Sequence, residues 1–268
     1  MTTPTKVGHL KAEGLRMSYQ RKGKPPTVVL EDCSVDVEPG RLTVIMGASG
    51  CGKSTLAYNL AGYLKPDSGR LTLDGESITG PGPDRLLVFQ ETALWPWMTV
   101  NDNVMFGPVA RREMSDAEAR EAALVLLERF GLRDFRDKYP GQLSGGMQRR
   151  AEIAQALINK PRVMIMDEPF RGLDEMTREL MQEYYMKLFE ETGLTTLFIT
   201  SELEEAIFLA DRILFMGGAP GSIVRTIEVD LPHPRTFEVL DSPAYLELKR
   251  EAMAQLYVGV DDEVGEPA

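Results

Sequence analysis

The feature that most constrains this chain is a glycine-rich loop placed between an apolar strand and a helix. The segment GASGCGKST at residues 47–55 follows an apolar run at residues 42–46 and leads into a helical pattern over residues 53–63. This order is typical of phosphate-binding loops, in which glycines let successive backbone N–H groups turn toward phosphate oxygens. The positive end of the helix dipole favours the same anion. The sequence therefore predicts an α/β fold that binds the phosphates of a nucleotide at this loop.

Two residues of the loop carry the predicted chemistry. Lys53 is expected to reach the β- and γ-phosphates of ATP, and the Ser54 hydroxyl is expected to hold a Mg²⁺ ion. A glycine-rich turn without a ligand is the alternative, and the flanking strand and helix disfavour it. The loop residues expected to contact ATP are Gly47, Ser49, Gly50, Cys51, Gly52, Lys53, Ser54 and Thr55.

A second chemical feature is a pair of carboxylates at the end of an apolar strand. Residues 163–166 are apolar and lead directly into Asp167 and Glu168. Because the carboxyl ends of parallel strands face the ligand crevice, both side chains are expected near the phosphate loop. Asp167 is predicted to bind Mg²⁺, usually through water, and Glu168 to take a proton from the attacking water or to orient it. Alone, the pair could equally be a solvated strand end, but the loop upstream favours the catalytic interpretation.

The rest of the chain alternates short apolar runs with helical patterns. Residues 10–19 and 28–37 flank a turn at residues 22–26, which predicts two antiparallel strands. The middle of the chain is helical, and strands then alternate with helices, which implies crossover connections. We therefore predict an α/β fold with a mostly parallel core sheet and an antiparallel β subdomain. Further strands are expected at residues 86–89, 163–166 and 195–200, and helices at residues 115–130, 146–159, 176–191, 203–210 and 243–257.

Composition bounds the location and the partners of the chain. Its 268 residues fit one large domain, expected over residues 1–259, followed by an acidic, flexible tail at residues 260–268. No apolar stretch reaches the ~20 residues of a spanning helix, and the N-terminus lacks the apolar core of a secretory signal, so a cytoplasmic location is expected. A formal net charge of −11 disfavours general binding to nucleic acid. Cys33 and Cys51 lack metal-ligand or redox spacing and are interpreted as reduced thiols.

A family resemblance emerges at residues 143–150, which read LSGGMQRR. This segment resembles the LSGGQ signature of ABC ATPases, with Met147 at the fifth position. The phosphate loop, Gln90, the signature, the Asp167–Glu168 pair and the segment ending at Asp174 follow one another in the family's order. The resemblance covers residues 10 to about 231, and it implies an ABC-type P-loop ATPase fold with a helical subdomain at about residues 91–160.

The resemblance also implies roles for residues outside the phosphate loop. Gln90 would contact Mg²⁺ and take part in catalysis, and Tyr19 would stack on adenine. A core residue at a strand end is the alternative for Tyr19, because aromatic side chains serve both uses. Two cassettes, expected to be identical copies, would enclose two ATP molecules between them. The residues expected to contact the ATP of the opposite cassette are Ser144, Gly145, Gly146, Gln148 and Asp174.

Two segments point to one branch of this family. Residues 90–104 (QETALWPWMTVNDNV) and 203–213 (LEEAIFLADRI) look like the nitrate/sulfonate/taurine importer group of ATPases. Such subunits energise uptake of small anions or related solutes through membrane permease subunits, to which an external solute-binding protein delivers the solute. The resemblance therefore implies a peripheral position on the inner face of the cell membrane. Trp95, Trp97 and Met98 are expected to line a surface that docks the permease; burial of one or both indoles within the helical subdomain is the alternative.

One position departs from the family pattern. The family places a histidine after the strand that ends here at residue 200, and this chain carries Ser201 instead. Serine keeps a hydroxyl donor but cannot become a cation, so it should stabilise developing charge less well. We expect slow ATP hydrolysis with Ser201 in the catalytic site; the alternatives are a non-hydrolysing ATP-dependent clamp or regulatory cassette, and pairing with an unlike cassette. Arg171 stands where the family usually has a small residue, and the sequence offers no physical reason for it.

Overall fold

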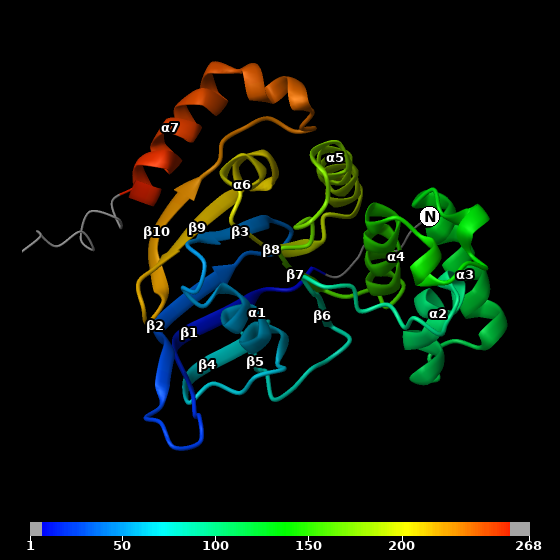
Figure 1. Cartoon of the computed structure of the whole chain (residues 1–268), viewed down its shortest axis with the longest axis horizontal. Helices are drawn as coiled ribbons and strands as arrows, with labels where there is room; N and C mark the ends of the chain where they lie inside the picture. Colours follow the sequence, from blue (N-terminus) through cyan, green and yellow to red (C-terminus); the bar gives the residue numbers. More distant parts are fainter. Residues whose placement is uncertain (1–6, 258–268) are drawn as a thin grey trace, which may run out of the picture.

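The core of the molecule is a six-stranded sheet that carries both predicted chemical motifs. The computed structural model describes residues 7–257, so the predicted tail at residues 260–268 lies outside the described range. The strand order is β10-β9-β3-β8-β7-β6, and every neighbouring pair is parallel except β9 and β10 (Figure 1). This confirms the predicted α/β fold with a mostly parallel core sheet. The strands are β3 (Leu42–Gly47), β6 (Arg85–Val88), β7 (Val163–Asp167), β8 (Thr195–Thr200), β9 (Arg212–Gly217) and β10 (Ser222–Glu228).

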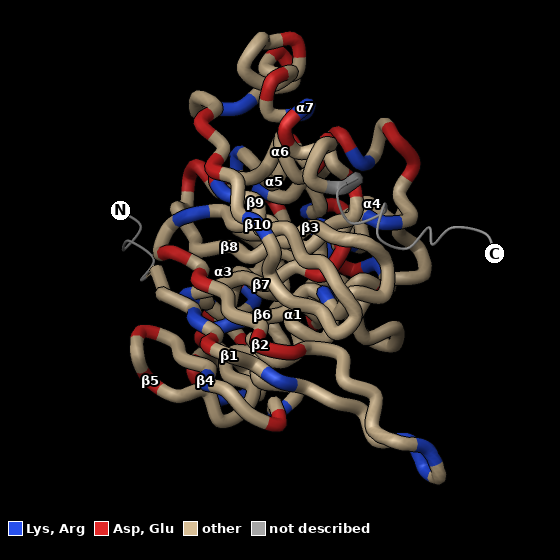
Figure 2. The backbone as a smooth tube through the Cα atoms, turned by 90° about the vertical axis from the view of Figure 1, so that its left-hand side faces the viewer, with Lys and Arg blue, Asp and Glu red and all other residues tan. Residues whose placement is uncertain are grey.

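A second sheet is antiparallel and packs against one face of the first. Its order is β2-β1-β4-β5, and the strands are β1 (Leu10–Tyr19), β2 (Thr27–Val37), β4 (Ser68–Leu73) and β5 (Glu76–Ser77). The antiparallel pairing of β1 with β2 confirms the prediction for residues 10–19 and 28–37. The hairpin that joins them extends beyond the body of the molecule, and its tip carries the exposed side chains of Arg21, Lys22 and Lys24 (Figure 2).

The two faces of the core sheet pack into separate hydrophobic cores, because side chains alternate along each strand. On β3, Ile45 belongs to the core shared with the antiparallel sheet and α1 (Lys53–Ala61), whereas Val44 and Met46 belong to the opposite core. The opposite face is covered by α5 (Glu175–Thr192), α6 (Leu203–Leu209) and α7 (Pro243–Tyr257) (Figure 1). With both faces covered, the central strands are buried along their length, and the chemically active groups lie at their ends.

Three helices form a lobe beside the core sheet: α2 (Val100–Ala110), α3 (Asp116–Arg129) and α4 (Gly145–Leu157) (Figure 1). Ser115 and Glu118 form a capping box, in which each side chain accepts a backbone N–H, so α3 begins where the sequence predicts. One face of α3 is fully buried through Ala119, Ala123 and Leu127. With the half-buried Ala122 and Leu126, these residues recur every three or four positions, which is the pattern that identifies the helix from the sequence.

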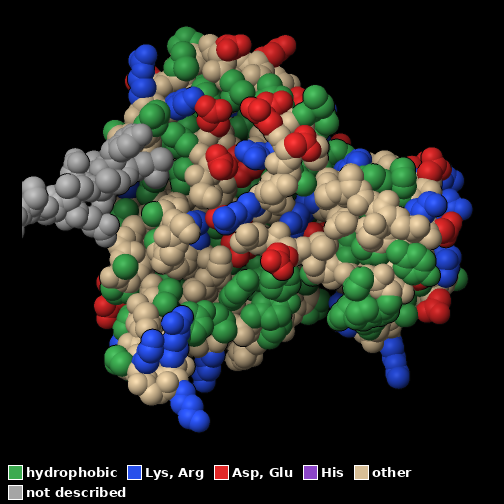
Figure 3. Space-filling model, in the orientation of Figure 1, with side chains coloured by type: hydrophobic (Ala, Val, Ile, Leu, Met, Phe, Trp, Pro, Cys, Tyr) green, Lys and Arg blue, Asp and Glu red, His purple; other side chains and the backbone are tan. Residues whose placement is uncertain are grey.

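Aromatic side chains are exposed on the segment that enters this lobe. Trp95 is 39% and Trp97 66% exposed, and their ring centroids lie 5.1 Å apart. Phe106 of α2 packs edge-on against Trp95 at 6.1 Å, and Met98 is half-buried beside them. Hydrophobic side chains reach the surface of the helical lobe (Figure 3). Neither indole is buried, which argues against the alternative that they pack inside the helical subdomain.

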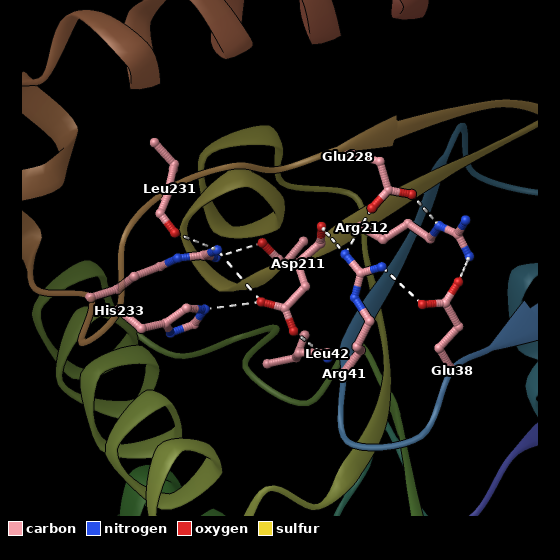
Figure 4. Close-up of polar contacts among 10 residues, drawn as sticks. Glu38, Arg41, Leu42, Asp211, Arg212, Glu228, Leu231 and His233 are labelled. Atoms are coloured by element: carbon pink, nitrogen blue, oxygen red, sulfur yellow. Dashed lines mark hydrogen bonds and ion pairs between the residues drawn. The ribbon is translucent and has the colours of Figure 1, made fainter.

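The C-terminal segment is fastened to the core sheet by a polar network around Asp211 (Figure 4). The Asp211 carboxylate accepts the backbone N–H of Leu42 at 2.8 Å and lies 3.0 Å from His233 Nε2 and 3.6 Å from Arg235. The Arg235 side chain is wholly buried and also donates to the backbone carbonyls of Phe208 and Ala210 at the end of α6. The network continues through ion pairs among Glu38, Arg41, Arg212 and Glu228. The predicted helix at residues 243–257 is present as α7 and packs on α6.

Two expectations from composition can be compared with the described residues. No helix within residues 7–257 combines the length and the apolar content that a bilayer-spanning segment needs. Cys33 and Cys51 are buried free thiols, as interpreted from their spacing. Burial raises the pKa of Cys33 to about 11 and also raises the pKa of Cys51, so both stay protonated and poorly nucleophilic near neutral pH.

Candidate functional site

The phosphate loop connects β3 to α1, and glycines determine its shape. Gly50 and Gly52 have φ values of +86° and +103°, in the left-handed region that glycine adopts without strain. Gly47 leaves no room for a side chain, because a Cβ there would meet the carbonyl oxygen of Met216 on β9. Lys53 opens α1, is only 6% exposed, and donates from Nζ to the Gly47 carbonyl at 2.7 Å. Its ammonium group therefore lies inside the loop, where nucleotide phosphates would be held.

Tyr19 lies at the end of β1 and beside the phosphate loop. Its hydroxyl is 3.3 Å from the Oγ1 of Thr55 in the first turn of α1. The residue is 38% exposed, which argues against the alternative that Tyr19 is a core residue. A partly exposed ring next to a phosphate loop can offer its face to a nucleotide base.

Asp167 ends β7 as a buried carboxylate that lacks part of its hydrogen bonding. It is 1% exposed, and its Oδ1 is buried without a hydrogen-bond partner. Burial raises the pKa of Asp167, while a hydrogen bond from the Ser54 hydroxyl favours the charged form. A buried oxygen of this kind is costly unless a cation or a donor completes it. Asp167 and Ser54 together therefore fit a hard cation that prefers oxygen ligands, as Mg²⁺ does.

Glu168 follows Asp167 in a turn that departs from regular strand geometry. Its φ is +43°, a left-handed value that costs a non-glycine residue on the order of 1–3 kcal/mol, and its N–H donates to the Ile199 carbonyl of β8 at 2.9 Å. The Ser201 hydroxyl donates to Glu168 Oε1 at 3.2 Å, and Arg171 Nη1 donates to Oε2 at 2.7 Å. The fold thus brings Glu168 and Ser201 together and adds Arg171.

A small cavity of about 160 Å³ opens beside Glu168. A water molecule takes roughly 30 Å³ of liquid volume, so the cavity has room for water next to the carboxylate. Its charged and hydroxyl side chains come from the turn after β7, the end of β8 and the start of α5 and α6. They are Glu168, Arg171, Arg178, Thr200, Ser201, Glu202 and Glu205.

The segment after β6 presents Gln90 and is held by a buried arginine. Arg149 of α4 donates to the carbonyls of Phe89 and Gln90, each at 2.7 Å. The same guanidinium pairs with Glu152 at 2.7 Å, and the two side chains are 7% and 4% exposed. Gln90 itself is exposed. The helical lobe is therefore joined to the end of β6 at Gln90.

The signature residues begin α4, apart from the phosphate loop. Ser144 caps α4 by accepting the N–H of Met147 at 3.3 Å, and Gly145 and Gly146 form the first turn. Figure 1 shows α4 in the helical lobe and α1 between the two sheets. One chain therefore does not place its own signature on its own phosphate loop.

Two further residues predicted near the signature hold local turns. The Gln148 amide donates to the carbonyls of Pro140 and Leu143, at 3.0 and 3.3 Å. Asp174 caps α5 by accepting the N–H and the hydroxyl of Thr177, at 3.0 and 2.7 Å. The start of α5 lies against the signature, because a Cβ on Gly146 would come within 2.7 Å of a Thr177 methyl group.

Comparison with known proteins decides the family. The sequence profile described as ABC transporter matches residues 30–171. The chain belongs to the ABC transporter family. The nitrate import ATP-binding protein NrtD of Synechococcus elongatus is 42% identical to this ABC ATPase over 235 residues, 87% of this chain and 86% of that protein. The taurine import ATP-binding protein TauB of Roseobacter denitrificans is 42% identical over 214 residues, 80% of each chain.

A solved structure confirms the fold of the cassette. The dimeric post-hydrolysis state of the ATP-binding cassette MJ0796, bound to ADP and Pi, superposes on this ABC ATPase with a TM-score of 0.73. The two sequences are 29% identical, and the match covers 83% of this chain and 100% of that one. The prediction of an ABC-type ATPase is therefore confirmed.

Sequence reasoning missed the roles of two arginines in this ABC ATPase. Arg149 lies one turn after Gly145, the first residue of α4, a position from which an inward-facing arginine can reach the chain beyond β6. Arg171 was noted only as an unusual residue, yet it lies three residues after Glu168 in a tight turn. Spacing was the available signal in both cases, but only the fold shows which partner each guanidinium meets.

Proposed function

We propose that this ABC ATPase is the ATP-binding and ATP-hydrolysing subunit of an importer for small anions or related solutes. The observation that carries the catalytic part is the unpartnered, buried Oδ1 of Asp167 beside Ser54, with Glu168 next in the chain. The printed functions of NrtD and TauB, nitrate and taurine import, support the transport part.

In the proposed mechanism, the phosphate loop binds ATP and Glu168 acts on water. Lys53 and the loop N–H groups bind the β- and γ-phosphates, and Tyr19 stacks on adenine. Ser54, Asp167 and Gln90 would hold Mg²⁺, which offsets phosphate charge when bound. Glu168 accepts a proton from the water that attacks the γ-phosphate. Ser201 donates its hydroxyl to Oε1 and so keeps this carboxylate oriented.

A second cassette completes each site in this proposal. The first N–H groups of α4 form an anion-binding helix terminus, and α4 lies apart from its own phosphate loop. An identical copy would therefore supply the signature to the ATP held by the first. The residues proposed for this contact are Ser144, Gly145, Gly146, Gln148 and Asp174. The dimeric MJ0796 structure supports this arrangement.

The permease is proposed to dock on the exposed aromatic surface formed by Trp95, Trp97 and Phe106. Exposed aromatic side chains are enriched in protein interfaces. This surface adjoins the segment around Gln90, which Arg149 links to α4. Docking of the permease and binding of the nucleotide would therefore both affect the conformation of this segment. The cassette would lie on the inner face of the membrane, and an external solute-binding protein would deliver the solute to the permease.

A non-hydrolysing, ATP-dependent clamp or regulatory cassette is the second candidate. The observation that favours it is Ser201, the residue after β8, which contacts the Glu168 carboxylate through a neutral hydroxyl. Closure of such a clamp would need ATP binding but no proton acceptor.

Phosphate release by the purified chain, alone and with its permease, distinguishes the two candidates. Glu168→Gln should bind ATP normally but release phosphate at least about 10²-fold more slowly, because it loses the general base. Equal phosphate release by both proteins, with ATP bound by both, would contradict the hydrolytic proposal and support the clamp. Recovery of the wild-type chain without any membrane protein, from cells that express the proposed permease, would contradict the importer assignment.

A further inference from the structure

The carboxylate of Glu168 is held at both of its oxygens, and the two holders differ in charge. Ser201 contacts Oε1 at 3.2 Å through a neutral hydroxyl. Arg171 contacts Oε2 at 2.7 Å through a guanidinium. The Glu168 side chain is 10% exposed, whereas that of Arg171 is 61% exposed. The Glu168 carboxylate is therefore nearly buried, and it is contacted by the guanidinium of a largely exposed side chain.

The turn after β7 explains why residue 171 can make this contact. The Arg171 N–H donates to the Glu168 carbonyl at 3.1 Å, which closes a turn of four residues. Phe170, 1% exposed, anchors the turn in the core. The left-handed backbone at Glu168 directs the chain back on itself, so a long side chain at position 171 lies over the carboxylate.

Two of the other charged groups around this cavity have hydrogen-bond partners of their own. Glu205 accepts the Gln182 amide at 3.0 Å, and Arg178 donates to the Leu173 carbonyl at 3.3 Å. Glu202 lines the cavity without an ion pair to Arg171 among residues 7–257. Within that range, Arg171 is the one cation that forms an ion pair with Glu168.

We propose that Arg171 is a positioning residue for Glu168, and that it supplies from the turn after β7 the positive charge that Ser201 cannot supply from the segment after β8. By holding Oε2, Arg171 fixes the side chain so that Oε1, oriented by Ser201, faces the water in the cavity. This inference rests on the proposed role of Glu168 as general base. It gives a physical reason for an arginine at a position where the sequence offered none.

The test compares steady-state ATP hydrolysis by Arg171→Ala, Arg171→Lys, Ser201→His and the double variant Arg171→Ala/Ser201→His, all in the full chain. Arg171→Ala should lower kcat about fivefold and leave KM for ATP unchanged, because an exposed ion pair positions the base without touching ATP. Arg171→Lys should keep most of the kcat that Arg171→Ala loses. Ser201→His should raise kcat more in the Arg171→Ala background than in the wild type, because two cations at one carboxylate are partly redundant.

A matched control separates positioning from general charge loss. Arg133 forms an ion pair with Glu128 at the same 2.7 Å, and its side chain is 60% exposed. Arg133→Ala should leave kcat unchanged. An unchanged or increased kcat in Arg171→Ala would overturn the proposal, and so would equal effects of Ser201→His in both backgrounds. Turnover retained in Glu168→Gln would instead overturn the proposed function, so the two failures are distinguishable.

Discussion

Replacing Arg149 by methionine should destabilise the fold far more than replacing an exposed arginine with the same ion-pair distance. Arg149 and Glu152 are 7% and 4% exposed, and burial lowers the pKa of Arg149 and raises that of Glu152. Removing one partner of a buried pair typically costs about 3–5 kcal/mol, because the other charge stays buried without compensation. We expect a loss of about 4 kcal/mol for Arg149→Met. Arg133→Met breaks an exposed pair of equal length and should cost less than about 1 kcal/mol.

A double variant tests whether the uncompensated charge causes the loss. Arg149→Met/Glu152→Gln removes the charge but keeps an oxygen for the backbone N–H of Ala93, so it should recover about 2 kcal/mol. Low pH should also reduce the loss of stability caused by Arg149→Met. Burial raises the pKa of Glu152 in the folded state above its unfolded value of 4.5. The contribution of Glu152 to the free energy of unfolding is therefore fully present below pH 4.5 and is lost as pH rises through the folded-state pKa. The cost of Arg149→Met should therefore be smaller in acid than near neutral pH.

Urea unfolding followed by two signals provides the assay. Far-ultraviolet circular dichroism reports the whole chain, and tryptophan fluorescence reports the segment next to Gln90, since Trp95 and Trp97 are the two tryptophans of the sequence. A free energy of unfolding for Arg149→Met within about 1 kcal/mol of the wild type would refute the reasoning. A double variant no more stable than the single variant would refute the charge argument specifically.

Two further predictions concern the C-terminal segment. Tyr245→Phe should raise the free energy of unfolding by about 1 kcal/mol, because the buried Tyr245 hydroxyl has no hydrogen-bond partner. Burial also raises the pKa of Tyr245 to about 12. The stability that comes from this raised pKa is therefore fully present below pH ~10 and is lost as pH rises toward about 12. Tyr245→Phe should lose less stability than the wild type over that pH range. Arg235→Met should cost about 3 kcal/mol, because it leaves Asp211 and backbone carbonyls without their buried donor, whereas His233→Ala should cost less than about 1 kcal/mol.

Urea unfolding also measures these variants. A stability loss between pH ~10 and ~12 that is the same in Tyr245→Phe and the wild type would contradict the tyrosine prediction. Equal costs for Arg235→Met and His233→Ala would show that burial does not decide the strength of the contacts around Asp211.

Helices and strands can be predicted well from the sequence where a segment has a single, clear pattern of hydrophobic residues. The buried face of α3 has a helical repeat, β7 has the apolar run VMIM, and β8 is a short segment of β-branched and apolar residues, so the predicted bounds of each lie within one or two residues of the observed ones. By contrast, the sequence places residues 100–110 only within the predicted helical subdomain and gives no bounds for α2, which contains Gly107 and Pro108. The strands β4, β5, β9 and β10 are also absent from the prediction, because short strands, whether at an edge like β5 and β10 or inside a sheet like β4 and β9, acquire their stability from tertiary pairing.

The same distinction applies to the site. The loop at residues 47–55 and the pair Asp167–Glu168 could be predicted, because consecutive residues carry the chemistry. The distance from Ser201 to Glu168 could not, since it spans 33 positions and depends on how β8 lies beside β7. The contact of Arg149 with the Gln90 carbonyl spans 59 positions and depends on the helical lobe.

The order of strands in the core sheet has a consequence for biosynthesis. The strand that holds the phosphate loop, β3, has β8 and β9 as its two neighbours in that sheet. Both neighbours leave the ribosome long after the loop itself, since β8 begins at Thr195. Until then β3 is an apolar strand with two open edges, the kind of segment that pairs with other chains. A nascent chain that ends before Thr195 therefore contains the whole phosphate loop but lacks the two strands that pair with β3 and hold the loop in its folded conformation.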